Sequence, residues 1–365
     1  MNSSHVLTVA CLLVAALPLT PRAQEPRLSN AQLHPRAVEG GLQKTARALI
    51  TSQNGAAWLG YAVPLVEGNW HIGSSSADDA QISVSLRHYR SKLEDRGEGM
   101  NFQDNDKSDG AERSGFLLVL FRLADHNISR IRLFTDDCEL DGGGMNVFRL
   151  TNVQPRESIE FLASFVGAAG DGGKLGRRNS ETAIAAIALH ANPSADRALE
   201  RFVEPGRPET IREDTAFWLG NVRGQPGYEV LNRLVREDPS ERVREQCIFT
   251  LHLSKVPAAL DTIIDLARND HSAHLRSQAL FWLSQKAGEK AAKALSDAIE
   301  NDPEAEVKKK AVFALSQLPK DQGIPRLIQV ARANRNREVR KDAMFWLGQS
   351  NGPRAVDFFG EVLTH

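Results

Sequence analysis

Two acidic stretches carry the side chains that most resemble a chemical site. Residues 104–110 offer carboxylate and amide oxygens, the donors that calcium prefers. Their glycine falls one place later than in a calcium-binding loop, and no glutamate stands at the twelfth position, so the likeness is superficial. The second stretch surrounds Cys138 with Asp136, Asp137, Glu139 and Asp141 and runs into three glycines. It could hold a cation, but we interpret it as a solvated turn.

Other arrangements that carry chemistry are missing from the sequence. It contains no Gly-x-Ser-x-Gly elbow, no phosphate-binding loop, no His-Glu-x-x-His and no dinucleotide fingerprint. Its three cysteines are Cys11, Cys138 and Cys247, too few for a disulfide framework or a cysteine-based zinc site. We therefore expect no catalytic residue, no metal and no cofactor.

Phenylalanine recurs every 32 residues in the C-terminal half, at Phe217, Phe249, Phe281, Phe313 and Phe345. Three further columns keep the same register: an aliphatic residue six places earlier, a basic residue five places earlier and a leucine two places later. The basic column consists of Arg212, Arg244, Arg276, Lys308 and Arg340. Chance does not align five copies of such columns, so this half of the chain is a repeat array.

A second apolar helix follows each phenylalanine-bearing helix. Fourteen residues after each phenylalanine stands an apolar residue, in order Leu231, Ile263, Leu295, Leu327 and Phe359. Apolar pairs follow three and four residues later, which marks one face of a helix. Asp, Asn, Pro and Ser at residues 237–240 and 301–304 supply turn and N-cap chemistry between helices. With a degenerate unit at about residues 182–203, the pattern predicts a mostly α protein with an α-solenoid of about six helix pairs over residues 181–365.

The sequence pattern of the repeat is clearest at residues 339–348, which consist of a β-branched residue, arginine, polar and small residues, then Leu-Gly. This pattern resembles the HEAT repeat family, in the short form known from phycobilin-lyase HEAT-like proteins. The resemblance covers about half of the chain and implies the solenoid fold, while saying little about function. HEAT-like di-iron hydroxylases use His-Glu pairs in successive repeats, and none of the ten histidines here precedes a glutamate. No distinctive motif of a bilin lyase or isomerase is present either.

The phenylalanine column lies on the polar side of its helices. On a helical wheel it points away from the core face, and one turn further on stand Gln285, Gln317 and Gln349. The HEAT resemblance implies that these helices line the concave side of the solenoid. We therefore predict that the five phenylalanines and three glutamines form a partner-binding surface, because exposed apolar stripes mark binding sites. The alternative is that the rings merely pack against one another, and both can hold at once.

Two neighbouring columns have structural interpretations. Large and small residues alternate at Trp218, Thr250, Trp282, Ala314 and Trp346, which indicates packing between repeats. The basic column faces acids at Asp238, Asp270 and Asp302. In HEAT repeats such residues commonly pair from repeat to repeat, so we favour an ion-pair ladder over phosphate binding. The formal net charge of -1 also argues against a nucleic-acid partner.

The N-terminal half has strand patterns. Alternating residues occur at 82–89 and 130–133, an apolar run occurs at 116–123, and a further strand is expected at 57–66. Residues 125–127 fit a hairpin turn, and residues 157–166 fit a short helix. We predict a small α+β domain with an antiparallel sheet at residues 45–166, containing a polar loop at 93–114. A glycine-rich linker is expected at residues 167–180.

An apolar run occupies residues 6–19, which is too short to span a membrane as a helix. It fits a secretory signal peptide over residues 1–23, although no Lys or Arg precedes it and Pro21 is atypical near a cleavage site. A buried N-terminal helix is the alternative. We expect export to the periplasm or outside of a bacterial cell, with no membrane span after cleavage.

Taken together, the sequence predicts an exported, non-enzymatic scaffold or adaptor. Its composition, 41% hydrophobic and 25% charged, is ordinary for a folded protein. We expect it to bind a protein or peptide on the concave face of the solenoid. The alternative is a HEAT-like enzyme of the lyase or oxidoreductase type. The oligomeric state is left open.

Overall fold

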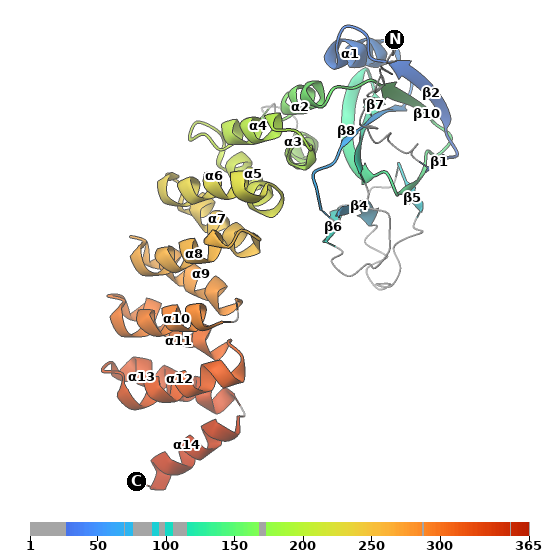
Figure 1. The fold of residues 1–365 in the computed structure, drawn as a ribbon. Helices are drawn as coiled ribbons and strands as arrows, with labels where there is room; N and C mark the ends of the chain where they lie inside the picture. The colour runs from blue at the N-terminus through green and yellow to red at the C-terminus, as the bar shows by residue number, and fades with distance from the viewer. Residues whose placement is uncertain are drawn as a thin grey trace, which may run out of the picture.

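A computed structural model describes residues 27–68, 70–75, 90–94, 99–104, 115–167, 173–286, 288–350 and 352–364. A strand-rich N-terminal part is followed by a long array of helix pairs (Figure 1). The expected signal peptide at 1–23 and the strand predicted at 82–89 lie outside the described residues, as does most of the polar loop at 93–114 with its calcium-like segment.

A five-stranded sheet, in the order β2-β10-β3-β7-β8, forms the centre of the N-terminal part. Its strands are β2 (Gln32–Ala37), β10 (Asn146–Thr151), β3 (Ala57–Pro64), β7 (Phe116–Ala124) and β8 (Asn127–Thr135). Strands β3, β7 and β8 are antiparallel, and Asp125 and His126 adopt positive φ in the predicted hairpin turn between β7 and β8.

The predicted antiparallel sheet is in fact mixed, because β10 pairs in parallel with both β2 and β3. The sheet also begins at Gln32, before the predicted boundary at residue 45. Strand β2 contains Pro35 and is mostly exposed, so it carries no alternating hydrophobic pattern. Edge strands of this kind are invisible to periodicity, which explains the late boundary.

The two faces of the sheet are covered differently. Leu59 and Tyr61 of β3 face helices α1 (Leu42–Ser52), α2 (Pro155–Ala163) and α3 (Gly173–Leu189). Trp58 faces a second core, which the small parallel sheet β1-β9-β5 covers. Those strands are β1 (Arg27–Ser29), β9 (Glu139–Asp141) and β5 (Arg90–Lys92), and a separate antiparallel pair consists of β4 (Trp70–Ser75) and β6 (Gly99–Asp104).

Helix α3 occupies much of the predicted linker at 167–180, so that prediction is wrong from residue 173 onward. The residues from Ala183 to Leu189 are all completely buried between the sheet and the array. The side chain of Asn179 accepts a hydrogen bond from Ile131 N of β8, at 3.0 Å. Packing on the sheet therefore holds a helix in a segment whose glycines, taken alone, favour coil.

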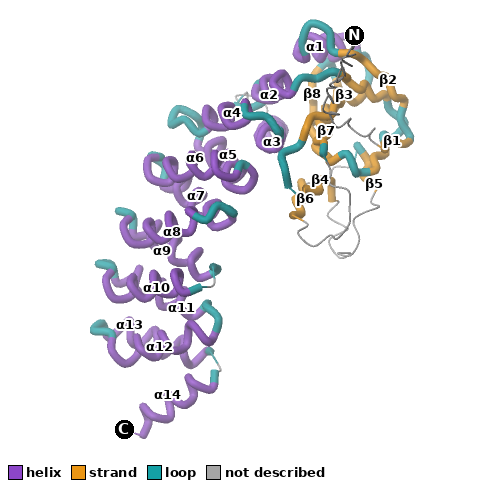
Figure 2. Tube along the Cα trace, in the orientation of Figure 1, coloured by secondary structure: helices purple, strands orange, loops and turns teal. Residues whose placement is uncertain are grey.

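The C-terminal array has the predicted architecture of helix pairs with a 32-residue period (Figure 2). The first pair, α3 and α4 (Ser194–Phe202), corresponds to the degenerate unit. The phenylalanine-bearing helices are α5 (Glu209–Val222), α7 (Glu241–Leu253), α9 (Ala273–Ser284), α11 (Ala305–Ser316) and α13 (Arg337–Gln349). Their second helices are α6 (Gly224–Glu237), α8 (Ala258–Asn269), α10 (Glu289–Asn301), α12 (Lys320–Ala333) and α14 (Pro353–Thr364).

Local chemistry sets where these helices begin. Ser240, Ser272 and Asn336 occupy the N-cap positions of α7, α9 and α13, and their side chains accept hydrogen bonds from the backbone of the first turn. One continuous hydrophobic core extends from Leu42 beside the sheet to Phe358 in α14. Among the described residues, no helix has both the length and the apolar character needed to cross a membrane.

Candidate functional site

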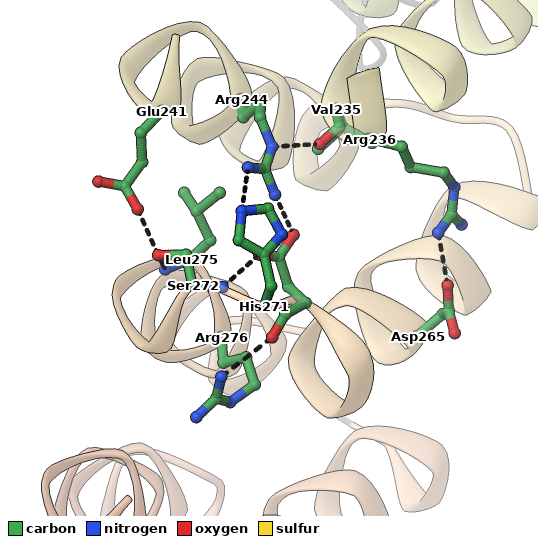
Figure 3. A network of polar contacts seen from close by, with 10 residues as sticks. Val235, Arg236, Glu241, Arg244, Asp265, His271, Ser272, Leu275 and Arg276 are labelled. Atoms are coloured by element: carbon green, nitrogen blue, oxygen red, sulfur yellow. Dashed lines mark hydrogen bonds and ion pairs between the residues drawn. The ribbon is translucent and has the colours of Figure 1, made fainter. Parts of the chain in front are cut away.

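A ladder of buried ion pairs joins successive repeats. Arg276 Nε and Nη2 donate to the two carboxylate oxygens of Asp302 at 2.7 and 3.0 Å. Arg212 and Asp238 form the same bidentate pair at 2.8 and 3.1 Å. Arg244 Nη2 donates to the carboxylate of Asp270. Its Nε donates to the carbonyl oxygen of Val235 (Figure 3). Three members of the basic column, Arg212, Arg244 and Arg276, therefore form the predicted ion-pair ladder.

Each aspartate of the ladder also shapes the chain. Asp238, Asp270 and Asp302 accept a hydrogen bond from the backbone N–H two residues later, at 2.8–2.9 Å. The same carboxylate thus turns the chain into the next repeat and binds the preceding one. Because both partners are buried, removing either leaves a charge without compensation.

One rung of the ladder differs. At the position of the aspartates, the fourth rung has Asn334, and its basic residue is Lys308. Lys308 Nζ donates to the carbonyl oxygen of Glu300, while Asn334 Nδ2 donates to the carboxylate of Glu300, at 2.9 and 3.0 Å. Two contacts with Glu300, one to its carbonyl oxygen and one to its exposed carboxylate, replace the buried ion pair at this junction.

The phenylalanine face consists of the predicted side chains Phe217, Phe249, Phe281, Phe313 and Phe345 with Gln285, Gln317 and Gln349. Its first four phenylalanines are half-buried, while Phe345 is 57% exposed. All three glutamines are exposed. The structure thus places the predicted residues at equivalent positions along one row of helices.

Tryptophan divides this face into clusters instead of a continuous row of phenylalanines. Trp282 contacts Phe249 of the preceding repeat and Phe281 of its own, with ring centroids 4.9 and 5.0 Å apart. Trp346 contacts Phe313 and Phe345 in the same way, at 5.0 and 5.1 Å. The rings therefore pack against one another and remain partly accessible.

Sequence reasoning missed the contribution of these tryptophans to the surface. Trp218 is buried, as expected for packing between repeats, but Trp282 and Trp346 are only half-buried. Each of the two follows a small residue in the preceding repeat, Thr250 or Ala314. That alternation is the signal that was available: a small residue leaves room for the next tryptophan to reach the preceding phenylalanine.

His252 is a further residue of the central cluster that the sequence did not single out. Its ring lies 4.9 Å from that of Trp282, and the side chain is half-buried. Burial lowers the pKa of His252, and the nearby Lys286 acts in the same direction. The imidazole is therefore neutral at neutral pH, and its cluster is predominantly aromatic and uncharged.

The glutamines are anchored at their helix ends. Gln285 and Gln317 are the C-cap residues of α9 and α11, and each Nε2 donates to the hydroxyl of the preceding serine at 3.1 Å. Those serines donate in turn to the carbonyl oxygens of Phe281 and Phe313. Gln285 and Gln317 are thus held in the same way at equivalent positions of successive repeats.

Charge changes along the phenylalanine face. At the N-terminal end, Glu213 pairs with Arg242, and burial together with Glu181 raises the pKa of Asp214 to about 6. In the repeats of α11 and α13 the corresponding positions include the exposed Lys310 and Lys341. The face is acidic at α5 and basic at α11, while at α13 Lys341 stands beside Asp342.

A buried polar triad lies where the array meets the sheet. His190 Nδ1 donates to the carbonyl oxygen of Ala186, and the Ser158 hydroxyl lies 2.9 Å from His190 Nε2 and 2.8 Å from the Tyr61 hydroxyl. All three side chains are at most 3% exposed, so no substrate can reach them. Burial lowers the pKa of His190 to about 4, which keeps the ring neutral. The triad joins β3, α2 and the end of α3 and has a structural role.

The cysteines and acidic residues that the structure describes offer neither a thiolate nor a metal site. Burial raises the pKa of the Cys138 thiol to about 11 and that of Cys247 further still, so neither is a thiolate at neutral pH. No group of three or more His, Cys, Asp or Glu side chains among the described residues is arranged to hold a metal ion.

Comparison with known families identifies the repeat. Residues 228–316 match the family model for HEAT repeats, so this stretch is a run of HEAT repeats, as the 32-residue pattern predicts. A search of curated protein sequences found no match.

Three solved structures similar to this chain illustrate the extent of the likeness. The complex of CpcE and CpcF of phycocyanin lyase from Nostoc sp. PCC7120 is 22% identical over 42% of this chain and 99% of that one, with a TM-score of 0.32. Human deoxyhypusine hydroxylase is 14% identical over 57% and 90%, with a TM-score of 0.25. The Cnd3-Cnd2 subcomplex of S. pombe condensin is 18% identical over 53% and 26%, with a TM-score of 0.36.

Proposed function

We propose that the phenylalanine face binds an extended segment of a partner protein, and that the chain acts as an exported scaffold rather than an enzyme. One observation carries this proposal: partly accessible aromatic rings and exposed glutamines recur at equivalent positions in successive helices. A surface that repeats along an array matches a ligand that repeats along its length, such as a peptide backbone.

The packing of the helices supports a concave position for this face. The helices that carry the phenylalanines pack more closely against one another than their second helices do. In a curved array the inner row of helices is the more tightly packed one. A peptide on the inner side would contact several repeats at once.

The chemistry of the face suits a peptide of mixed character. Aromatic clusters at Trp282 and Trp346 accept apolar side chains, while the glutamine amides can exchange hydrogen bonds with a peptide backbone. Opposite charges at the two ends of the face fix a direction. The acidic end of the peptide lies over α11 and α13, near Lys310 and Lys341, and its basic end lies over α5.

Export is the second part of the proposal. It is supported by the apolar run at residues 6–19, whose length fits a signal peptide and falls short of a membrane span. Expression of the full chain in a bacterium, followed by fractionation and N-terminal sequencing, tests it. A mature protein that begins near residue 24 in the periplasm or medium is expected, and an uncleaved cytoplasmic protein would contradict export.

Peptide selection on the immobilised chain tests the binding surface. Peptides enriched from a random display library should bind the unaltered protein and bind Phe345→Ser at least about tenfold more weakly, because interface aromatics commonly contribute more than about 1.4 kcal/mol. Phe345 is 57% exposed, so this substitution should leave the unfolding free energy within about 0.5 kcal/mol of its original value.

Controls separate this surface from general stickiness. Glu237→Ser at the exposed end of α6 should leave peptide affinity unchanged. The double change Lys310→Glu and Lys341→Glu should weaken the binding of peptides that carry an acidic end. Equal binding by all variants would place the peptide site elsewhere, and an absence of enriched peptides would refute the proposal.

A further inference from the structure

The aromatic rings of the phenylalanine face gather at every second junction between repeats. Trp282 contacts the phenylalanine rings of α7 and α9, and we call this group the first cluster. Trp346 contacts those of α11 and α13, and this group is the second cluster. At the junction between them, where α9 meets α11, the tryptophan position is held by the buried Ala314. The clusters are therefore separated by a junction without a tryptophan.

The part of the face nearest the sheet carries no cluster of this kind. At the junction of α5 and α7 the tryptophan position is Thr250, which is completely buried. Trp218 of α5 is buried as well, and the phenylalanine position before it is the buried Ala185. Among the helices that the structure describes, the face thus offers two accessible tryptophan-centred clusters.

The distance between the two clusters follows from how the helices pack. Helix α9 packs against α11, and α11 packs against α13, in succession along the array (Figure 1). Packed helices have axes about 8–10 Å apart, so the equivalent residues Trp282 and Trp346 are separated by about 16–20 Å. An extended chain advances about 3.3 Å per residue. It therefore passes from one cluster to the other in about five or six residues.

The surface between the clusters is polar and basic. Helix α11 exposes Lys310 and Gln317 on this face, on either side of Phe313. Lys309 pairs with Glu306 at 3.0 Å, whereas Lys310 forms no ion pair with any residue that the structure describes. An ammonium group at this position favours a carboxylate on the ligand. A segment that crosses α11 should therefore be polar there and carry an acidic side chain.

We propose that the phenylalanine face selects peptide segments in which two apolar side chains stand about five or six residues apart, with an acidic residue between them. One apolar side chain packs on each cluster, and the acidic side chain pairs with Lys310. This inference rests on the proposed function, because it specifies which peptides the face binds. Once one cluster holds its side chain, the second contact is intramolecular, so the spacing decides the affinity.

Synthetic peptides of constant length, with two leucines progressively further apart and one aspartate between them in a serine and glycine background, test the spacing. Fluorescence anisotropy with the full chain should give the tightest binding at a separation of about five or six residues. The shortest separations should bind at least about tenfold more weakly, because their backbone cannot reach both clusters. Longer separations should lose affinity gradually, since the additional residues loop out.

The outcomes of this series separate the spacing from the proposed function. Equal affinity at all separations would overturn the spacing while leaving peptide binding intact. Failure of the whole series, while peptides selected from the random library still bind, would overturn it as well. If the library peptides also failed to bind, the proposed function itself would be refuted.

A thermodynamic cycle assigns the second leucine to the second cluster. Phe345→Ser should weaken the best two-leucine peptide at least about tenfold. It should weaken a one-leucine peptide less than about twofold, because that peptide still has the first cluster. Glu237→Ser on α6 is the control and should leave both affinities unchanged. Equal losses for the two peptides would overturn the assignment of one leucine to each cluster.

Charge reversal tests the acidic residue between the leucines. Lys310→Glu should weaken the peptide that carries aspartate and strengthen a matched peptide with lysine in its place. A preference for aspartate that survives Lys310→Glu would refute the pairing with Lys310.

Discussion

Removing Arg276 should destabilise the array far more than removing its counterpart Arg340. The side chain of Asp302 is 3% exposed and receives two hydrogen bonds from the Arg276 guanidinium. In Arg276→Ala this carboxylate keeps its backbone N–H but loses its counter-ion inside the protein. Stranding one partner of a buried ion pair costs about 3–5 kcal/mol.

The chain supplies its own controls for this prediction. Arg340→Ala removes the same residue type from the same column without stranding a carboxylate, and should cost under about 1 kcal/mol. The double change Arg276→Leu and Asp302→Asn removes both charges of the rung. It should recover much of the loss, because no uncompensated buried charge remains.

Urea unfolding followed by far-ultraviolet circular dichroism measures these differences, and hydrogen exchange of α9 to α11 locates them. Exchange is needed because repeat arrays can unfold in parts, and then a single unfolding free energy is not defined. Equal losses in Arg276→Ala and Arg340→Ala would refute the reasoning that buried ion pairs hold the repeats together. The reasoning would also be refuted if the double variant were as unstable as Arg276→Ala.

Two further predictions concern the sheet junction and a close approach between helices. Burial lowers the pKa of His190 to about 4 in the folded state, so its imidazole binds a proton more readily in the unfolded chain. The free energy of unfolding is therefore unaffected by this residue above about pH 6.5 and falls by about 3 kcal/mol as the pH approaches 4. Urea midpoints measured from pH 7 to 4 should therefore fall less in His190→Gln than in the unaltered protein, whereas the exposed-site variant His126→Asn should follow the unaltered curve. Gly227→Ala should destabilise α6 by more than about 2 kcal/mol, since its Cβ would stand 1.9 Å from the carbonyl oxygen of Leu219. Gly348→Ala, where a Cβ meets nothing within 4 Å, should be neutral or stabilising, and similar melting temperatures for both glycine variants would contradict this account.

The array was predictable because its information is local and repeated. Each unit carries its own apolar face in the same register, three of them add an Arg–Asp rung, and five copies average out the ambiguity of any one. Ser240 and Ser272, for example, mark helix starts 32 residues apart in both sequence and structure.

The N-terminal sheet was predictable only in part, because its pairing is long-range. Strands β3 and β7 are hydrophobic enough to be recognised, but β10 joins the sheet by parallel pairing with β2 and β3, which lie far away in sequence. Nothing in residues 146–151 alone specifies those partners. Helix α3 was mistaken for a linker because its stability comes from burial against β8 and not from its own composition.

The candidate surface was predictable in position but not in detail. The wheel placed the phenylalanines opposite the core, but Trp282 covers the flanks of Phe249 and Phe281, and Trp346 covers that of Phe313, so these rings are half-buried. A helical wheel treats one helix at a time, so it contains no information on side chains that reach across from the next repeat. The role of His252 beside Trp282 was missed for the same reason.

The rung at Lys308 and Asn334 makes the array mechanically uneven. Earlier junctions are fastened by buried ion pairs, whereas this one depends on contacts with Glu300, whose own side chain lies at the surface. If the molecule is pulled between its sheet and its C-terminal helix, α13 and α14 should detach first while the remaining repeats hold. The terminal pair is thus the part of the protein that yields under tension, and a load carried through α14 is limited by this junction.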